Sequence, residues 1–138
     1  MAADDGTPIV ALATPWGRSA LAVVRLSGTG SHDVVRAVAR PHGPAPLVAG
    51  PPRRVDLVDD DEVFDDGIAW LQSAPHTYTG EDTAELTLHG NPVLVQRLLD
   101  AAVAAGARPA GPGAFTRRAV VHGKLDLVRA EGVHQAIA

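Results

Sequence analysis

The sequence contains no cysteine, and aromatic residues make up only 4% of its 138 residues. The absence of cysteine excludes a disulfide, a zinc ribbon and a thiol nucleophile within these residues. Because aromatic side chains are scarce, Ala, Val and Leu must supply most of the core. Hydrophobic residues make up 46% of the chain, which is enough for one domain with a substantial core, but the length is too short for two ordinary domains.

Basic residues do not dominate either, since 12 Lys and Arg face 16 Asp and Glu and leave a formal net charge of −4. A protein that holds nucleic acid by charge neutralisation alone needs a clustered Lys/Arg surface, so that class is disfavoured. The chain has no apolar run of membrane-spanning length, and its first residues lack a basic segment followed by an apolar one. We therefore expect a soluble cytoplasmic protein with no membrane partner.

Several catalytic and cofactor motifs are missing. The sequence has no phosphate-binding loop and hence no GTP site, no Gly-x-Gly-x-x-Gly fingerprint and no Gly-x-Ser-x-Gly. Its six histidines include no His-x-x-x-His pair, so a metal centre is not expected. The acidic residues 59–62 and Asp65 lack the glycine and terminal glutamate of a calcium loop, which favours a solvated turn. Together these absences favour a binding function over catalysis.

The most informative stretch covers residues 77–106, where a turn leads into an alternating strand and then into a helix. From Thr83 to His89, alternate residues are apolar, so Glu85 and His89 share the polar face of the predicted strand. Asn91-Pro92 supplies a helix N-cap followed by proline at the first helical position, and the helical spacing continues to Gly106. A half-solvated strand packed on an amphipathic helix explains this pattern, while a strand that ends beside a helix start also suits a ligand.

The remaining chain predicts further short elements. Ser31 is placed to cap a helix whose buried stripe contains Val34, Val35 and Val38. The Pro/Gly-rich residues 41–52 predict a loop, and Asp65-Asp66-Gly67 suggests a bulge in the second strand of a hairpin. Strands are predicted over residues 9–14, 20–27, 53–58, 63–71 and 107–110, and a further short helix over residues 114–121.

Two basic features leave alternatives open. Arg25 interrupts an apolar run, and either lies at a sheet edge with its charge in water or reaches into a pocket to meet an anion or a carbonyl. Arg117, Arg118 and Lys124 form the densest basic spot, which fits a solvated helix end or a site for phosphate or carboxylate. Residues 124–137 have helical periodicity that stops at Ala138, so we expect that a partner chain covers this helix or that the natural protein continues.

Five ordered blocks of sequence resemble a known family. They lie at residues 11–18, 24–28, 78–90, 112–119 and 123–131, and include Arg-Leu-Ser-Gly, Tyr-Thr-Gly-Glu-Asp and Gly-Lys-Leu-Asp-Leu. In this order they resemble the N-terminal region of the tRNA modification GTPases MnmE, also called TrmE. The resemblance covers nearly the whole chain, from about Ile9 to Ala138.

The resemblance implies an α+β fold, a mixed or antiparallel sheet with flanking helices, similar to the folate-binding half-domain of the glycine cleavage T-protein. It implies a folate-binding and dimerisation domain over residues 1–122, and the start of a truncated helical domain over residues 123–138. The implied ligand is 5-formyltetrahydrofolate or a related tetrahydrofolate, bound at or near the interface of a homodimer. The full-length protein would act with an MnmG-like, FAD-dependent partner to modify the wobble uridine of tRNA.

By the same resemblance, the folate-contacting residues fall on Arg25, Glu85 and Lys124, with no catalytic residue and no metal ligand. A carboxylate such as Glu85 can accept from the ring N–H and the exocyclic amine of a pterin at once. Arg25 and Lys124 can bind the pterin carbonyl, the formyl oxygen or the glutamyl tail, and the sequence does not distinguish these possibilities.

The chain also departs from the family pattern. Ser19-Ala20 replaces two glycines, Asn91 replaces another glycine, and Ala114 replaces a glutamate. A second hypothesis is therefore a divergent dimerisation or assembly module that has lost folate binding. A third, a free-standing one-carbon transferase, is weaker because a single half-sized lobe lacks its partner domain, and only Glu85 and His89 stand out as general bases.

Overall fold

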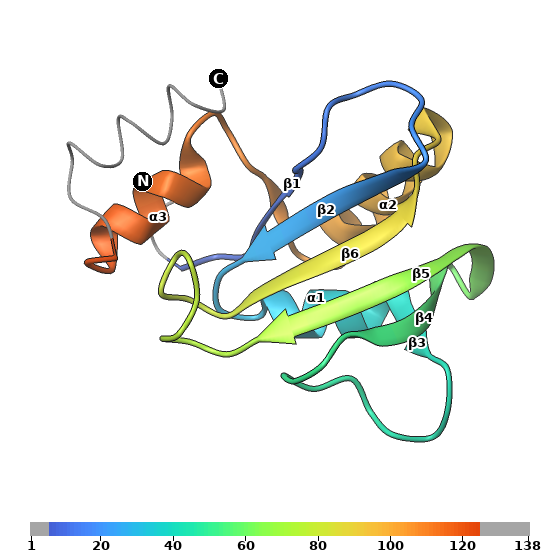
Figure 1. Ribbon diagram of the computed structural model, residues 1–138, viewed down its shortest axis with the longest axis horizontal. Coiled ribbons are helices and arrows are strands. Elements are labelled where there is room, and N and C mark those ends of the chain that lie inside the picture. The colour runs from blue at the N-terminus through green and yellow to red at the C-terminus, as the bar shows by residue number, and fades with distance from the viewer. Residues whose placement is uncertain (1–5, 125–138) are drawn as a thin grey trace.

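The computed structural model describes residues 6–124 and centres on a sheet of seven strands (Figure 1). The strand order is β3-β4-β5-β6-β2-β1-β7, and every neighbouring pair is antiparallel except β1 and β7, which are parallel. The predicted α+β class with a mixed sheet is thus confirmed. The strands are β1 (Ile9–Leu12), β2 (Leu21–Ser27), β3 (Ala39–Pro41), β4 (Arg53–Asp59), β5 (Glu62–Gln72), β6 (Thr83–His89) and β7 (Arg108–Pro109).

Three helices complete the described part of the chain: α1 (Ser31–Val38), α2 (Pro92–Ala104) and α3 (Ala114–Val121). Helices α1 and α2 lie together on one face of the sheet, whereas α3 lies beyond one end of it (Figure 1). The opposite face of the central strands carries polar and half-exposed side chains. This open face is where the polar residues of β2, β5 and β6 come together.

The core lies between the sheet and the two helices. Ala84, Leu86 and Leu88 of β6 are each at most 1% exposed, as their alternation predicted, and they pack in one cluster with Leu98 and Ala102 of α2. Each fully buried leucine contributes about 1.5–3 kcal/mol to stability. Because the apolar face of β6 is fixed in this core, its polar face must point to the open side of the sheet.

Strands β4 and β5 form the predicted hairpin. Asp60 and Asp61 make the tight turn with positive φ angles of 47° and 65°, a conformation that aspartate tolerates better than most residues. The predicted bulge at residues 65–67 is wrong in position. Leu57 pairs with Asp65 and Val58 with Val63, so the extra residue on β5 is Phe64.

The two predicted helix caps have different outcomes. The side chain of Asn91 accepts from the Val93 N–H at 2.8 Å and Pro92 opens α2, as predicted. The prediction that Ser31 caps α1 is wrong. The left-handed Gly30 takes the cap position at φ 87°, and the buried Ser31 hydroxyl donates instead to the Asp82 carbonyl at 3.1 Å.

The chain after Lys124 lies outside the described residues, and with it most of the helix predicted over residues 124–137. The expected domain boundary after residue 122 therefore stays a prediction. Within residues 6–124, no helix has the length and apolar character needed to cross a membrane.

Candidate ligand-binding site

A cavity of ≈ 160 Å³ lies on the open face of the sheet, beside the first half of β6. Its walls come from three strands, from the loop that precedes β6, and from α3. The lining residues are Arg25 of β2, Gln72 of β5, Tyr78 and Thr79 of the loop, Thr83 and Glu85 of β6, and Phe115 of α3. Two of the three predicted site residues, Arg25 and Glu85, therefore meet here.

Arg25 and Glu85 face each other directly across neighbouring strands. The Arg25 Nε and Nη2 donate to Glu85 Oε2 at 3.0 and 2.9 Å, and the two side chains remain 43% and 31% exposed. The alternative that placed Arg25 at a sheet edge is wrong, because β2 lies between β6 and β1. A cation and a carboxylate are thus held in one cavity, where both can reach a ligand.

The third predicted residue, Lys124, is not in the cavity lining. Its Nζ donates to the Pro75 carbonyl at 3.1 Å, at the start of the loop that carries Tyr78 and Thr79. A Cβ built on Gly80 would come within 3.3 Å of the Lys124 Cγ, so the lysine lies against this loop. Lys124 is therefore near the cavity wall without forming part of it.

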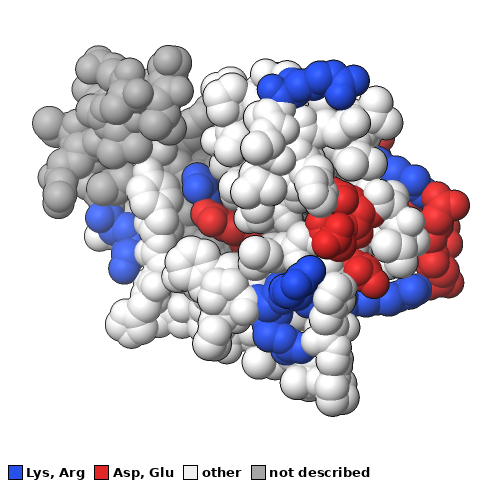
Figure 2. All heavy atoms as spheres, turned by 45° about the vertical axis from the view of Figure 1, so that its right-hand side comes forward, with Lys and Arg blue, Asp and Glu red and all other residues white. Residues whose placement is uncertain are grey.

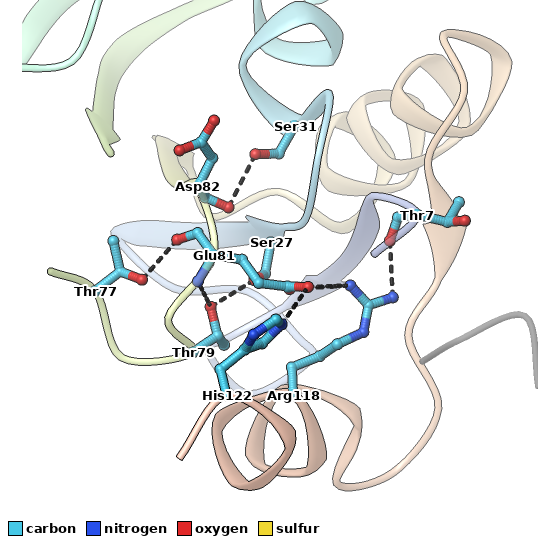
Figure 3. A network of polar contacts seen from close by, with 9 residues as sticks. All are labelled: Thr7, Ser27, Ser31, Thr77, Thr79, Glu81, Asp82, Arg118 and His122. Atoms are coloured by element: carbon cyan, nitrogen blue, oxygen red, sulfur yellow. Dashed lines mark hydrogen bonds and ion pairs between the residues drawn. The ribbon is translucent and has the colours of Figure 1, made fainter. Parts of the chain in front are cut away.

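Behind the cavity, Glu81 joins the loop to α3 in a buried polar network (Figure 3). Arg118 Nη1 donates to both oxygens of Glu81 at 2.9 Å, and Arg118 Nη2 donates to the Thr7 carbonyl at 2.7 Å. His122 Nε2 lies 3.2 Å from Glu81 Oε2. The solvated helix end expected at Arg118 is wrong, because its side chain is only 1% exposed; Arg117 beside it is exposed as expected.

Hydroxyl groups complete this network. Ser27 Oγ donates to Glu81 Oε1 at 2.8 Å and lies 2.7 Å from Thr79 Oγ1, while Thr77 Oγ1 donates to the Glu81 carbonyl at 2.6 Å. Tyr78 adds a link on the cavity side, with its hydroxyl 3.2 Å from Thr116 Oγ1. The loop is therefore fixed both to β2 and to α3.

Sequence reasoning identified Arg25 and Glu85 but missed the rest of the cavity wall, namely Gln72, Tyr78, Thr79, Thr83 and Phe115. The sequence did contain a signal for part of this wall, because the loop and the start of α3 lie in two of the blocks that carry the family resemblance. What the sequence does not reveal is that Glu81 and Arg118, 37 positions apart, are partners.

A second polar group occupies the other end of β6. His89 Nδ1 lies 2.8 Å from Asp65 Oδ1, and the His89 N–H donates to Asp65 Oδ2 at 3.1 Å. The hydrogen bond to Asp65, followed by the charge of Asp65, raises the pKa of His89. Within residues 6–124, Asp65, Asp66 and His89 have ligand atoms close enough for a metal ion, all within 4.8 Å. These hydrogen bonds fasten β5 to β6 and account for the approach of Asp65 to His89, while Asp66 Oδ2 lies 4.0 Å from Arg54 Nη2.

The sequence pattern also suggested a ligand where β6 ends beside the start of α2, at the His89 end of the open face. A hollow of ≈ 300 Å³ lies there, lined by residues that include Arg54, Asp66 and His89. It is larger and more open to solvent than the Arg25–Glu85 cavity, and it contains neither of those two side chains. We take the Arg25–Glu85 cavity at the start of β6 as the candidate site, because it holds two of the three predicted site residues.

Comparison with known proteins agrees with the resemblance seen in the sequence blocks. The family described as "GTP-binding protein TrmE N-terminus" matches residues 8–124. The chain is 48% identical over 134 residues to the tRNA modification GTPase MnmE of Aquifex aeolicus, a match that covers 95% of this chain and 29% of that protein.

Two further relatives give the same result. The proteins named tRNA modification GTPase MnmE from Halorhodospira halophila and from a strain of Thermus thermophilus are 47% and 44% identical, over 97% and 91% of this chain. These matches cover 28% and 30% of the two relatives, so the chain spans less than a third of their length. With the family match over residues 8–124 and these identities, the chain belongs to the N-terminal domain family of the tRNA modification GTPases MnmE (TrmE).

Proposed function

We propose that this domain binds a reduced folate, 5-formyltetrahydrofolate or a related tetrahydrofolate, in the Arg25–Glu85 cavity. The observation that carries the proposal is the placement of this half-exposed ion pair inside a walled cavity on an otherwise open sheet face. Glu81, the other glutamate of the same sequence block, is buried, and its carboxylate already accepts hydrogen bonds from Ser27 and Arg118. Glu85 is therefore the carboxylate that a ligand can reach.

The lining suits a flat, polar ring. The Glu85 carboxylate can accept from two neighbouring N–H groups of a pterin, in the manner of a charge-assisted bidentate pair. Arg25 can donate to the ring carbonyl or the formyl oxygen. Tyr78 and Phe115 supply aromatic surface for the ring. When bound, the folate would supply a one-carbon unit, while the residues of this chain bind and orient it.

The size of the cavity indicates which part of the ligand enters. Its ≈ 160 Å³ is below the range of about 300–1,000 Å³ that is usual for sites of drug-sized ligands. We therefore place the bicyclic ring inside and leave the glutamyl tail outside the wall. Lys124, beside the loop at Pro75, is the cation that we assign to the tail carboxylates.

We further propose that the domain forms a homodimer, in which two copies reproduce the two-lobed arrangement of the glycine cleavage T-protein. Supporting this, the open sheet face exposes apolar side chains: Trp70, opposite Glu85, is 37% exposed, and Leu21 and Ile68, toward the His89 end, are 58% and 44% exposed. A second copy could cover this surface and complete the small cavity. Dimerisation would then bring two folate sites to one interface.

Activity on tRNA is proposed for the full-length protein, with an MnmG-like, FAD-dependent partner and a GTPase domain that this chain does not contain. On the face shown in Figure 2, Lys and Arg side chains lie in separate groups among Asp and Glu. Such a surface, on a chain with a net charge of −4, does not favour tRNA binding by charge neutralisation alone. We therefore place tRNA contacts mainly outside this domain.

The alternative proposal is an assembly module that dimerises without folate. It is favoured by Ala114, which stands beside Phe115 of the cavity wall where the family usually has glutamate. Calorimetric titration with 5-formyltetrahydrofolate separates the two proposals. Saturable binding that is strongly weakened in Glu85→Ala supports the folate site, whereas a stable dimer with no binding supports the assembly module.

A further inference from the structure

Helix α3 forms one wall of the cavity, but it is not part of the hydrophobic core. In the described part of the chain, the core consists of side chains from the strands, from α1 and α2 and from adjoining segments. The hydrophobic residue of α3 that is fully buried, Ala119, lies outside that cluster. Figure 1 shows the same separation, with α3 beyond the end of the sheet. Apolar packing on the core therefore does not hold this wall in place.

Polar contacts anchor α3 instead. Arg118 connects it to Glu81 of the loop through two hydrogen bonds and to Thr7 near the chain start through a third, as Figure 3 shows. The Arg118 and Glu81 side chains are 1% and 6% exposed. Charges buried to this degree are stable only when paired, and removing one partner leaves the other uncompensated. Removing either partner would therefore penalise the docked position of α3, because the remaining charge would be buried without its partner.

The two elements joined by this pair also supply the cavity wall. Tyr78 and Thr79 come from the loop and Phe115 from α3. The Tyr78 hydroxyl also approaches the Thr116 hydroxyl where the loop meets α3. Neither Glu81 nor Arg118 lines the cavity itself. If α3 left the loop, Phe115 would leave the cavity wall while Arg25 and Glu85 stayed on the sheet.

We propose that Glu81 and Arg118 are positioning residues that keep α3 docked over the cavity, and that ligand affinity depends on this buried pair. The proposal rests on the folate site proposed above for its binding part only. The docking of α3 is a property of the chain without ligand, and it can be measured separately.

The first measurement is amide hydrogen exchange on the unliganded chain. Arg118→Met leaves the buried Glu81 without its guanidinium and with only His122 and hydroxyl partners, so we expect exchange in residues 77–82 and 114–122 to accelerate on the order of 100-fold. Exchange in β6 should change far less, because its amides lie in the core sheet. Arg40→Met, which breaks the exposed pair between Arg40 of β3 and Asp61 of the β4–β5 turn, is the matched control and should leave both regions unchanged.

A double variant separates the pair from general destabilisation. In Glu81→Met/Arg118→Met no buried charge is left unpaired, so part of the lost protection should return relative to Arg118→Met alone. Two independently destabilising changes would instead add. An additive loss of exchange protection in the double variant would overturn the docking role. Uniform acceleration of amide exchange that includes β6 would overturn it as well.

Ligand binding is measured through the fluorescence of Trp70, which pairs with Glu85 across β5 and β6. The measurement uses a Trp16→Phe background, in which Trp70 is the only tryptophan. If Arg118→Met reduces the docked fraction to about one tenth, the apparent Kd for 5-formyltetrahydrofolate rises about tenfold. An unchanged Kd, in a variant whose exchange shows α3 undocked, would overturn the positioning role. Absence of binding in the parent chain would instead reject the folate site, and exchange alone would then decide whether the pair docks α3.

Discussion

Arg25 Nη2 lies 2.9 Å from Glu85 Oε2, although the two residues are 60 positions apart in the sequence. The antiparallel register of β2 and β6 places them opposite each other, and the buried alternate residues of both strands direct these two side chains to the open face. Exposed cross-strand ion pairs contribute little to stability, about 0.2–1 kcal/mol. We therefore interpret the pair as a ligand site more than as a structural support.

Glu85→Ala should weaken the binding of 5-formyltetrahydrofolate far more than it weakens the fold. Hydrogen bonds to a charged group contribute about 1.5–3 kcal/mol, so the Kd should rise roughly 10- to 100-fold. The free energy of unfolding should fall by less than about 1 kcal/mol, since the lost ion pair is half-exposed. Calorimetry and urea unfolding measure the two quantities. Glu62→Ala, at the exposed first position of β5, is the control and should leave the Kd unchanged.

Lys124→Ala should distinguish the tail of the ligand from its ring. If Lys124 meets the glutamyl carboxylates, the variant weakens binding of 5-formyltetrahydrofolate and leaves binding of a tetrahydropterin without the tail unchanged. Parallel calorimetric titrations with the two ligands provide the measurement. Equal loss for both ligands would place Lys124 at the ring, contrary to our assignment.

Leu86→Ala tests the core on which the polar face depends. Leu86 is fully buried in the core cluster, so the substitution should lower the free energy of unfolding by about 2–5 kcal/mol. Val93→Ala, at a position that is 74% exposed on α2, should change it by no more than about 0.5 kcal/mol. Similar effects at both positions would contradict the burial pattern of β6 and α2.

Asn91→Ala removes the side-chain cap of α2. The Val93 N–H loses its acceptor, and the free energy of unfolding should fall by about 0.5–2 kcal/mol. Asn91→Asp keeps an acceptor oxygen and should retain most of the stability. Urea unfolding of the two variants compares them, and equal losses would show that the cap contributes nothing.

The His89–Asp65 pair predicts a small pH dependence of stability. The hydrogen bond and charge of Asp65 raise the pKa of His89 above its ordinary value of 6.5. The pair therefore stabilises the folded state fully below about pH 6.5, and this contribution is lost as the pH rises through the folded pKa. NMR titration of the His89 ring should give a pKa above 6.5, and Asp65→Asn should lower it. A pKa of 6.5 or below in the parent chain would contradict the contact.

Much of the fold could be predicted because local patterns agree with the tertiary structure. The alternation in β6, the Asn91-Pro92 start of α2 and the limits of α3 all follow from periodicity and capping chemistry. The short strand β3 could not be predicted, since its three residues follow α1 directly and owe their extended form to pairing with β4. Ser31 was misassigned because Gly30 takes the cap position, so that Ser31 is already the first helical residue and its hydroxyl bonds the distant Asp82 carbonyl.

The site was only partly predictable. Arg25 and Glu85 carry local signals, a cation in an apolar run and a carboxylate on a polar strand face. Arg118 gave the opposite signal, because two adjacent arginines at a helix end normally indicate solvent exposure. Its burial depends on Glu81 and Thr7, which lie 37 and 111 positions away. Local sequence contains no information on such distant partners.

Calorimetric titration of the chain with 5-formyltetrahydrofolate, with the mass in solution determined on the same sample, tests the central claim most directly. The proposed site predicts saturable binding of one ligand per chain, by a dimer, with the Kd raised roughly 10- to 100-fold in Glu85→Ala and unchanged in Glu62→Ala. A folded dimer that releases no heat and shows no change in Trp70 fluorescence at any ligand concentration would contradict the folate site and leave the assembly module as the better account.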